Sequence, residues 1–212
     1  LAAGLRVDLL QGYVDTVLFR DVVERRGVTQ VAALRWLTRQ CLKNPAGSFS
    51  VHRLHQDLKA QGLGVAKDAL HSMVGHLEDA FLLRCVPLAT ESERRRNSNP
   101  RKIYPVDNGM IGAFDRTGRS NVGHALETVV LHELDRRQAE VGYVRTGTGH
   151  EVDFLARFHG GREELIQVCA DTGPAETRER ELRALEEALR EHPRATPKLL
   201  VLNFEQLAVK VP

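Results

Sequence analysis

The stretch "EVDFLARFHGGREELIQVCAD", residues 151–171, predicts two β-strands joined by a tight turn. Gly160 and Gly161 supply the turn, because glycine adopts the positive φ angles that short hairpin loops require. The second strand, "EELIQVCA", is apolar almost throughout, which is typical of a strand inside a sheet. This hairpin would place Asp153 on its first strand and Gln167 and Cys169 on its second.

The flanking sequence extends this hairpin into an α-β-β-β-α-β order over residues 123–204. "VGHALETVVLHELDRRQAE" predicts an amphipathic helix, and "VGYVR" predicts a strand before the hairpin. "PAETRERELRALEEALREH" predicts a long charged helix, and "KLLVLNF" a last strand. The expected inward residues are Leu126, Val129, Val130 and Leu134 on the first helix, and Leu182, Leu185 and Leu189 on the second.

The preceding half of the chain has a different, mainly helical pattern. Helical periodicity runs over residues 5–27 and stops at Gly27, and a second helix is expected from Thr29. Two shorter helices follow around the turn "QGLG", with Leu70, Met73, Val74 and Leu77 expected to be buried in the longer one. The strands "FLLRCVPLA" and "KIYPV" then enclose a polar loop. Three helices and a hairpin in this order indicate a winged helix, and residues 107–122 are expected to form a flexible connector.

Charge divides the chain in the same way. Residues 1–120 contain 18 Lys and Arg against 12 Asp and Glu, a balance of +6, whereas residues 121–212 contain 12 against 16, a balance of −4. Their sum is the net charge of +2. Three widely spaced cysteines indicate free thiols in a reducing cytoplasm. Because no long apolar run and no signal-peptide pattern are present, a cytoplasmic location without membrane contact is expected.

Five stretches, taken together and in order, resemble the C-terminal part of a prokaryotic AAA-type ATPase family. They are "YVDTVLFRDVVERRGV", "KIYPVDNGM", "GHALETVVLHEL", "YVRTGTGHEVDFL" and "LIQVCAD" followed by "TRERELRAL". In that family an N-terminal P-loop ATPase is joined to a winged helix and a PD-(D/E)XK nuclease-like domain. The resemblance implies an α/β (α+β) chain in four parts: a linking helix (1–28), the winged helix (29–106), a connector (107–122) and the nuclease-like domain (123–212).

The resemblance also implies where nucleotide chemistry belongs. The chain contains no G-x-x-x-x-G-K-[ST] sequence, the motif whose backbone and lysine cradle phosphates. We therefore expect a fragment of a longer protein, with ATP and Mg²⁺ belonging to an ATPase domain outside it. No cofactor is expected in the fragment itself.

In the nuclease fold, carboxylates on neighbouring elements hold Mg²⁺ and a lysine stabilises the developing negative charge. The matching positions are Glu127, Asp153 and Gln167, with Cys169 at the place of the lysine, so Glu127 and Asp153 are the candidate metal ligands. A thiol cannot supply the positive charge, which predicts lost or impaired catalysis. Two alternatives stay open: Arg145 replaces the lysine, or the two carboxylates are remnants held by hydrogen bonds, with Glu127 pairing to Arg145.

The winged helix suggests contact with nucleic acid. The candidate phosphate-binding residues are Lys67 on the expected recognition helix and Arg94, Arg95, Arg96 and Arg101 in the wing. Winged helices also dock proteins, so a protein partner is the alternative. Three functions are therefore weighed: a non-catalytic module that binds DNA or a partner protein, an atypical Mg²⁺-dependent nuclease, and a structural tail for self-association.

Overall fold

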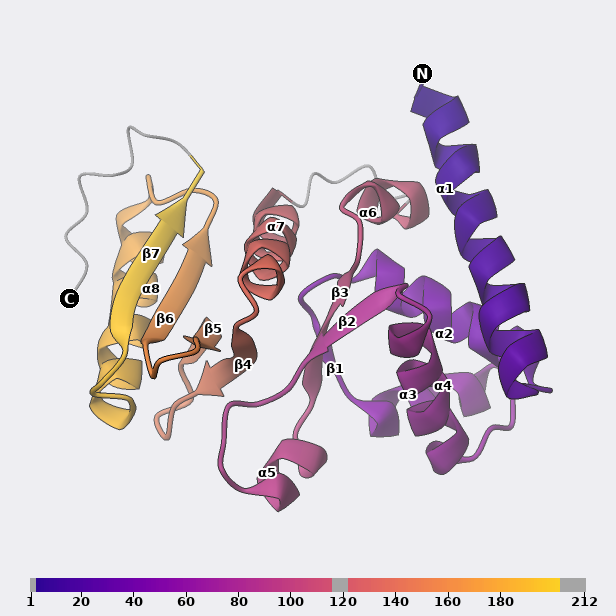
Figure 1. The fold of residues 1–212 in the computed structure, drawn as a ribbon, viewed down its shortest axis with the longest axis horizontal. Helices are drawn as coiled ribbons and strands as arrows, with labels where there is room; N and C mark the ends of the chain where they lie inside the picture. The colour runs from indigo at the N-terminus through magenta and orange to yellow at the C-terminus, as the bar shows by residue number, and fades with distance from the viewer. Residues whose placement is uncertain (1–2, 116–121, 203–212) are drawn as a thin grey trace. The chain divides into compact units, whose positions relative to one another are not determined.

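The computed structural model describes residues 3–115 and 122–202, drawn as a ribbon in Figure 1. Helices and two small sheets make up these residues, which confirms the expected α+β class. The chain divides into two compact units, residues 1–85 with 100–120 and residues 86–99 with 121–212. No helix within the described ranges is long and apolar enough to cross a membrane.

The first unit is built on helices around an apolar core. Helix α1 (Ala3–Val17) continues into the π-helix η1 (Leu18–Glu24), and Gly27, with a φ of 65°, ends the helical run as predicted. Then come α2 (Val31–Lys43), α3 (Val51–Ala60) and α4 (Lys67–Asp79). Apolar residues at helical spacing fill the core, which confirms the burial predicted for α4: Leu34, Leu37, Leu42, Leu58, Leu70, Met73, Val74 and Leu77.

A three-stranded sheet completes the first unit. Strands β2 (Leu83–Val86) and β3 (Arg101–Pro105) correspond to the predicted hairpin. A two-residue strand, β1 (Ser48–Phe49), pairs antiparallel with β3 and gives the order β1-β3-β2. So short a strand shows no alternation in the sequence, and it was not predicted.

Two segments expected to lack regular structure contain short helices. The polar loop holds α5 (Glu93–Ser98), which begins where the Ser92 hydroxyl accepts a hydrogen bond from Arg95 N at 3.3 Å. The connector holds α6 (Gly109–Phe114), which buries Met110, Ile111 and Ala113 and packs against α1 and α2. Burial of these apolar side chains outweighs the low helix propensity of the two glycines in α6.

The second unit contains the predicted α-β-β-β-α-β order. It runs from α7 (Val122–Arg136) through β4 (Glu140–Arg145), β5 (Glu151–Arg157), β6 (Glu163–Cys169) and α8 (Ala175–Glu191) to β7 (Thr196–Val201). The sheet order is β4-β5-β6-β7, antiparallel except for the parallel pair β6/β7 that α8 connects. Gly160 and Gly161 turn the hairpin with φ angles of 88° and 84°, and β6 lies inside the sheet, as expected.

The buried faces of α7 and α8 match the predicted apolar stripes only in part: Leu134 and Leu185 are buried and Leu189 packs on the core, as expected. Helix α7 buries Glu127, Thr128, Leu131 and Leu134, whereas Val129 is 50% exposed. Helix α8 buries Glu181, Ala184, Leu185 and Ala188. Each helix therefore turns one carboxylate inward. The sequence prediction placed every charged residue on the exposed side of the helix, so it did not include Glu127 or Glu181 in the buried face.

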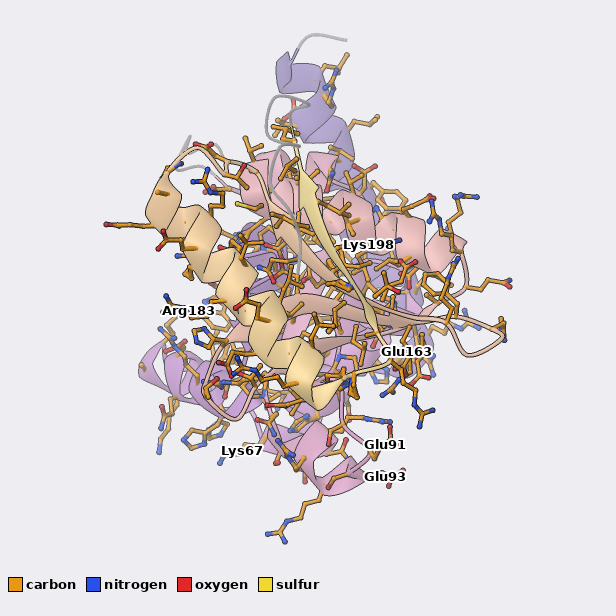
Figure 2. All side chains as sticks on the ribbon, turned by 90° about the vertical axis from the view of Figure 1, so that its left-hand side faces the viewer. Lys67, Glu91, Glu93, Glu163, Arg183 and Lys198 are labelled. Carbon is orange, nitrogen blue, oxygen red and sulfur yellow. The ribbon has the colours of Figure 1, made fainter. Side chains whose placement is uncertain are left out.

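Residues 86–89 run beside the first strand of the second unit's sheet. Leu88 forms a parallel bridge with Tyr143, Ala89 N donates to Tyr143 O at 2.8 Å, and Tyr143 N donates to Pro87 O at 2.9 Å. Gly142 permits this approach, because a Cβ there would lie 3.0 Å from the Ala89 Cα. Glu91 and Glu163, both labelled in Figure 2, each pair with Arg157.

Candidate functional site

A pocket of about 470 Å³ lies within the second unit, among α7, β5, β6 and α8. Glu127, Asp153, Gln167 and Cys169, the four residues singled out from the sequence, all line it. Glu127 reaches it from the inward face of α7 and Asp153 from β5, while Gln167 and Cys169 come from alternate positions of β6. The structure thus brings the predicted positions together.

The strand residues of the pocket are joined by hydrogen bonds. Val168 N donates to Asp153 Oδ2 at 2.9 Å, and Asp153 N donates to Gln167 Oε1 at 3.3 Å. The other end of the Gln167 amide, Nε2, donates to Glu181 Oε2 on α8 at 2.7 Å. Both ends of the Gln167 side chain are therefore committed to neighbouring groups, and this side chain links β5 to α8.

Glu181 is a buried carboxylate with two kinds of donor. It is 7% exposed, and besides the Gln167 amide it accepts from Arg180 Nη2 at 2.6 Å and Nε at 3.1 Å. These bonds offset the cost of removing the charge from water. The hydrogen bond to Glu181 also raises the pKa of Arg180, whose guanidinium remains exposed at the mouth of the pocket.

Cys169 stands in the pocket as a neutral thiol. Burial raises the pKa of the thiol, against a smaller opposing effect of the backbone at Asp171. As a thiol, Sγ donates a hydrogen bond to Asp171 O at 3.1 Å. A thiol whose pKa lies above its usual range of about 8.5 stays protonated at neutral pH. Cys169 therefore supplies neither a positive charge nor a reactive thiolate.

The sequence did not reveal the roles of Arg180 and Glu181. Both lie in "TRERELRAL", where alternating charges indicated a solvated helix face. The available signal was spacing, because Glu181 precedes the buried Leu185 by four residues and so shares its face. Arg145, the cation expected near Glu127, is exposed on β4 and does not line the pocket.

Glu127 and Asp153, the candidate metal ligands, are two of the four carboxylates that line the pocket, with Glu151 and Glu181 as the others. In the described ranges, no group of three or more His, Cys, Asp or Glu side chains is placed to hold one. The Gln167 oxygen, the third ligand expected from the sequence, accepts from Asp153 N instead. A metal site at Glu127 and Asp153 stays a prediction.

The five candidate phosphate-binding residues fall in different units. Arg94, Arg95 and Arg96 are on α5 in the second unit, where Arg96 donates to Thr90 O at 2.8 Å and the first two are exposed. Lys67 begins α4 in the first unit and contacts His52 Nδ1 at 3.1 Å, and Arg101 lies on β3. Within the described residues, Arg94 and Arg95 form no ion pair.

Comparisons with known proteins give relatives without a known activity. A family model described as "Domain of unknown function (DUF8612)" matches residues 2–121. An uncharacterized protein of Methanocaldococcus jannaschii, MJ1544, is 28% identical over 192 residues, or 89% of this chain and 42% of that protein. An uncharacterized protein of Haemophilus influenzae is 24% identical over 154 residues, or 72% of this chain and 38% of its own length. No solved structure matches. The chain spans about two fifths of the length of these curated relatives.

Proposed function

We propose that this chain, which belongs to the family described as a domain of unknown function (DUF8612), is a non-catalytic module that binds duplex DNA. One observation carries the non-catalytic half of the proposal. Two of the groups expected to hold a metal are used in internal hydrogen bonds: Asp153 accepts from Val168 N, and the Gln167 amide bonds to Asp153 N and to Glu181. The uncharged Cys169 occupies the position where the nuclease family has a lysine.

We propose a winged helix for the first unit. The order α2-β1-α3-α4-β2-β3, with β3 between β1 and β2, supports this assignment because a winged helix has the same element order. In that fold α4 is the helix that approaches the DNA groove, and Lys67 lies in its first turn. Arg101 on β3 belongs to the same unit.

For the second unit we propose a PD-(D/E)XK nuclease-like scaffold. Its support is the α-β-β-β-α-β order with a parallel β6/β7 pair, and the meeting of Glu127, Asp153 and Gln167 in one pocket. The scaffold would then serve to present side chains for binding. Arg94 and Arg95 on α5 are the residues of this unit best suited to phosphate, because they are exposed cations without an ion-pair partner among the described residues.

DNA binding is tested by fluorescence anisotropy with a labelled 20-base-pair duplex at 50 to 200 mM KCl. We expect affinity that falls steeply with salt and varies little with base sequence. Replacing both Arg94 and Arg95 with alanine removes two phosphate contacts, so the slope of log K against log salt should become about 2 units shallower. Affinity should fall for every sequence tested.

The matched control is Arg136→Ala, at the last residue of α7, together with Arg137→Ala directly after it. It removes the same charge from two neighbouring arginines, but both pair with Glu133 at 2.6 and 2.7 Å. Equal binding by the two double variants would contradict a phosphate contact at α5. If the chain does not bind the duplex but self-associates in sedimentation, the structural-tail function is favoured. If it neither binds the duplex nor self-associates, a protein partner is favoured.

We further propose that the longer protein to which this module belongs is a P-loop ATPase that uses ATP and Mg²⁺. The support is the sequence resemblance, together with relatives that are more than twice the length of the stretch they share with this chain. The module would couple DNA binding to that ATPase. A full-length gene product without a G-x-x-x-x-G-K-[ST] motif would refute this part of the proposal.

A second candidate function is an atypical Mg²⁺-dependent nuclease. The observation that favours it is Arg180, a cation that lines the same pocket as Glu127 and Asp153 and so brings a positive charge to the region where Cys169 has none. An arginine can stabilise developing negative charge in place of a lysine. This alternative requires Arg180 to leave Glu181, and it requires Glu127 and Asp153 to take up a metal.

A plasmid-nicking assay with Mg²⁺ or Mn²⁺ separates the two functions. We expect no nicking by the unmodified chain above the level of the Asp153→Ala variant, because the pocket's polar groups are engaged internally and its thiol is neutral. Arg145→Ala serves as a control, since Arg145 lies outside the pocket. Nicking that both Asp153→Ala and Arg180→Ala abolish, and that Arg145→Ala preserves, would establish the nuclease instead.

A further inference from the structure

A second pocket, of about 330 Å³, lies within the first unit among α1, η1, α2 and α6. Its volume is in the range of sites for small ligands. Cationic side chains from α2 form one part of the lining, and apolar side chains form another. The cations are Arg35, Arg39 and Lys43, and the apolar residues include Val14, Leu18 and Phe114.

The three cations follow from the sequence spacing of α2. Positions 35, 39 and 43 are four residues apart, so they share one helix face at intervals of about 6 Å. All three side chains are exposed, and Arg39 and Lys43 form no ion pair within the described residues. Asp15 contributes one carboxylate to the lining, so the pocket has a formal charge of +2 from three cations and one anion.

Arg35 is oriented by an aromatic ring. Its guanidinium carbon lies 4.8 Å from the centre of the Phe19 ring. A guanidinium stacked on a ring keeps its in-plane N–H donors available for an anion. Phe19 belongs to the π-helix η1, and π-helical turns occur frequently at functional sites.

A hydrogen bond between distant parts of the chain joins α1 to α6 at the pocket. Gln11 Nε2 on α1 donates to Ala113 O of α6 at 2.7 Å, and both residues line the pocket. This bond holds α6 against α1 beside the apolar lining. The pocket therefore combines a preformed apolar part with unpaired cations, which suits a ligand that has an apolar body and an anionic group.

We propose that this pocket binds a small organic phosphate, with the phosphate at Arg39 and Lys43 and the apolar part against the partly buried Phe114, beneath which Val14 and Leu18 belong to the core. The site is independent of the DNA contact proposed at α5. A phosphodiester backbone carries the same charged group but cannot place an apolar body in the pocket while its strand continues on both sides. The ligand is thus distinguished from DNA by its size and by its need for the apolar part.

Calorimetric titration of the full chain with phenyl phosphate, in 50 mM salt, tests the proposal. Phenyl phosphate should bind at least tenfold more tightly than inorganic phosphate, because only it uses the apolar lining. Arg39→Ala with Lys43→Ala should weaken phenyl phosphate binding at least tenfold. Both residues are exposed, so folding should be preserved, and circular dichroism checks this.

The matched control is Arg53→Ala with Lys59→Ala, two exposed cations on α3 of the same unit that do not line the pocket. This variant should bind phenyl phosphate as the unmodified chain does. Equal loss in both double variants, or no binding of phenyl phosphate at all, would overturn the proposal. The 20-base-pair duplex is titrated in parallel. Unchanged DNA affinity in the variant with Arg39→Ala and Lys43→Ala supports a separate small-molecule site. If this variant loses DNA binding and the unmodified chain does not bind phenyl phosphate, these cations bind nucleic acid instead.

Discussion

Replacing Gln167 with leucine is expected to destabilise the second unit by about 3 kcal/mol. The substitution introduces an apolar side chain of similar size, and it removes the acceptor at Asp153 N and the amide donor at the buried Glu181. A buried group that loses its hydrogen-bond partner costs about 1 to 3 kcal/mol, and a charged group costs more. The magnitude therefore reflects groups left unsatisfied rather than lost packing.

Hydrogen exchange measured by mass spectrometry can follow this change peptide by peptide. Exchange should accelerate in the peptides of β5, β6 and α8, while peptides of α2 and α4 in the first unit keep their protection. Gln56→Leu is the matched control, because Gln56 is exposed on α3 and its replacement should change stability by less than about 0.5 kcal/mol. Unchanged exchange in Gln167→Leu would mean that the Gln167 link between β5 and α8 contributes little.

The second large effect concerns pH and the two thiols of the first unit. Burial raises the pKa of Cys41 far above its usual value and that of Cys85 to about 12, the latter with help from the Glu78 carboxylate. In the unfolded chain both thiols lose a proton near pH 8.5. The folded state therefore binds more protons than the unfolded state above that pH.

Because of this difference in proton binding, the folded state becomes less stable as the pH rises. The contribution of each thiol to stability is fully present below about pH 8.5 and is lost as the pH rises toward the folded-state pKa. Each pH unit above about 8.5 costs about 1.4 kcal/mol per thiol, so at pH 10 the free energy of unfolding should be lower by about 2 kcal/mol for each. Both thiols are almost completely buried, so solvent does not screen the effect.

Urea unfolding at pH 7 and pH 10, under reducing conditions, measures this loss. Trp36 is the single tryptophan of the chain and packs on the core of the first unit, so its fluorescence reports that unit. Cys41→Ala should remove about 2 kcal/mol of the difference between the two pH values, whereas Cys169→Ala in the second unit should leave it unchanged. An identical pH dependence in Cys41→Ala would contradict ionisation of a buried thiol as its cause.

Sequence patterns predicted the elements whose side chains carry strong local signals. The apolar runs around Gly160 and Gly161 specify both strands of the central hairpin, and helical spacing identifies the buried face of α4. The short helices α5 and α6 were not predicted. A cap at Ser92 stabilises α5 and tertiary burial of Met110 stabilises α6, more than the helix propensity of their residues does.

The part of the candidate site that lies on the paired strands β5 and β6 was predictable from the sequence. Asp153 and Gln167 come from strands joined by a tight turn, so their proximity follows from the hairpin alone. Glu181 and Arg180 come from α8, and their meeting with Gln167 depends on how that helix lies on the sheet. A charged residue on a buried helix face contradicts the usual pattern, and only the partners that the fold supplies make it stable.

The pairing of residues 86–89 with β4 bears on how the protein behaves at high concentration. β4 is the first strand of its sheet, and an uncovered outer strand offers a row of backbone donors and acceptors to other chains. Pro87 and Ala89 use part of that row through their backbone hydrogen bonds with Tyr143. Gly142 makes the close approach possible, so a residue with no side chain protects this edge against intermolecular strand pairing and aggregation.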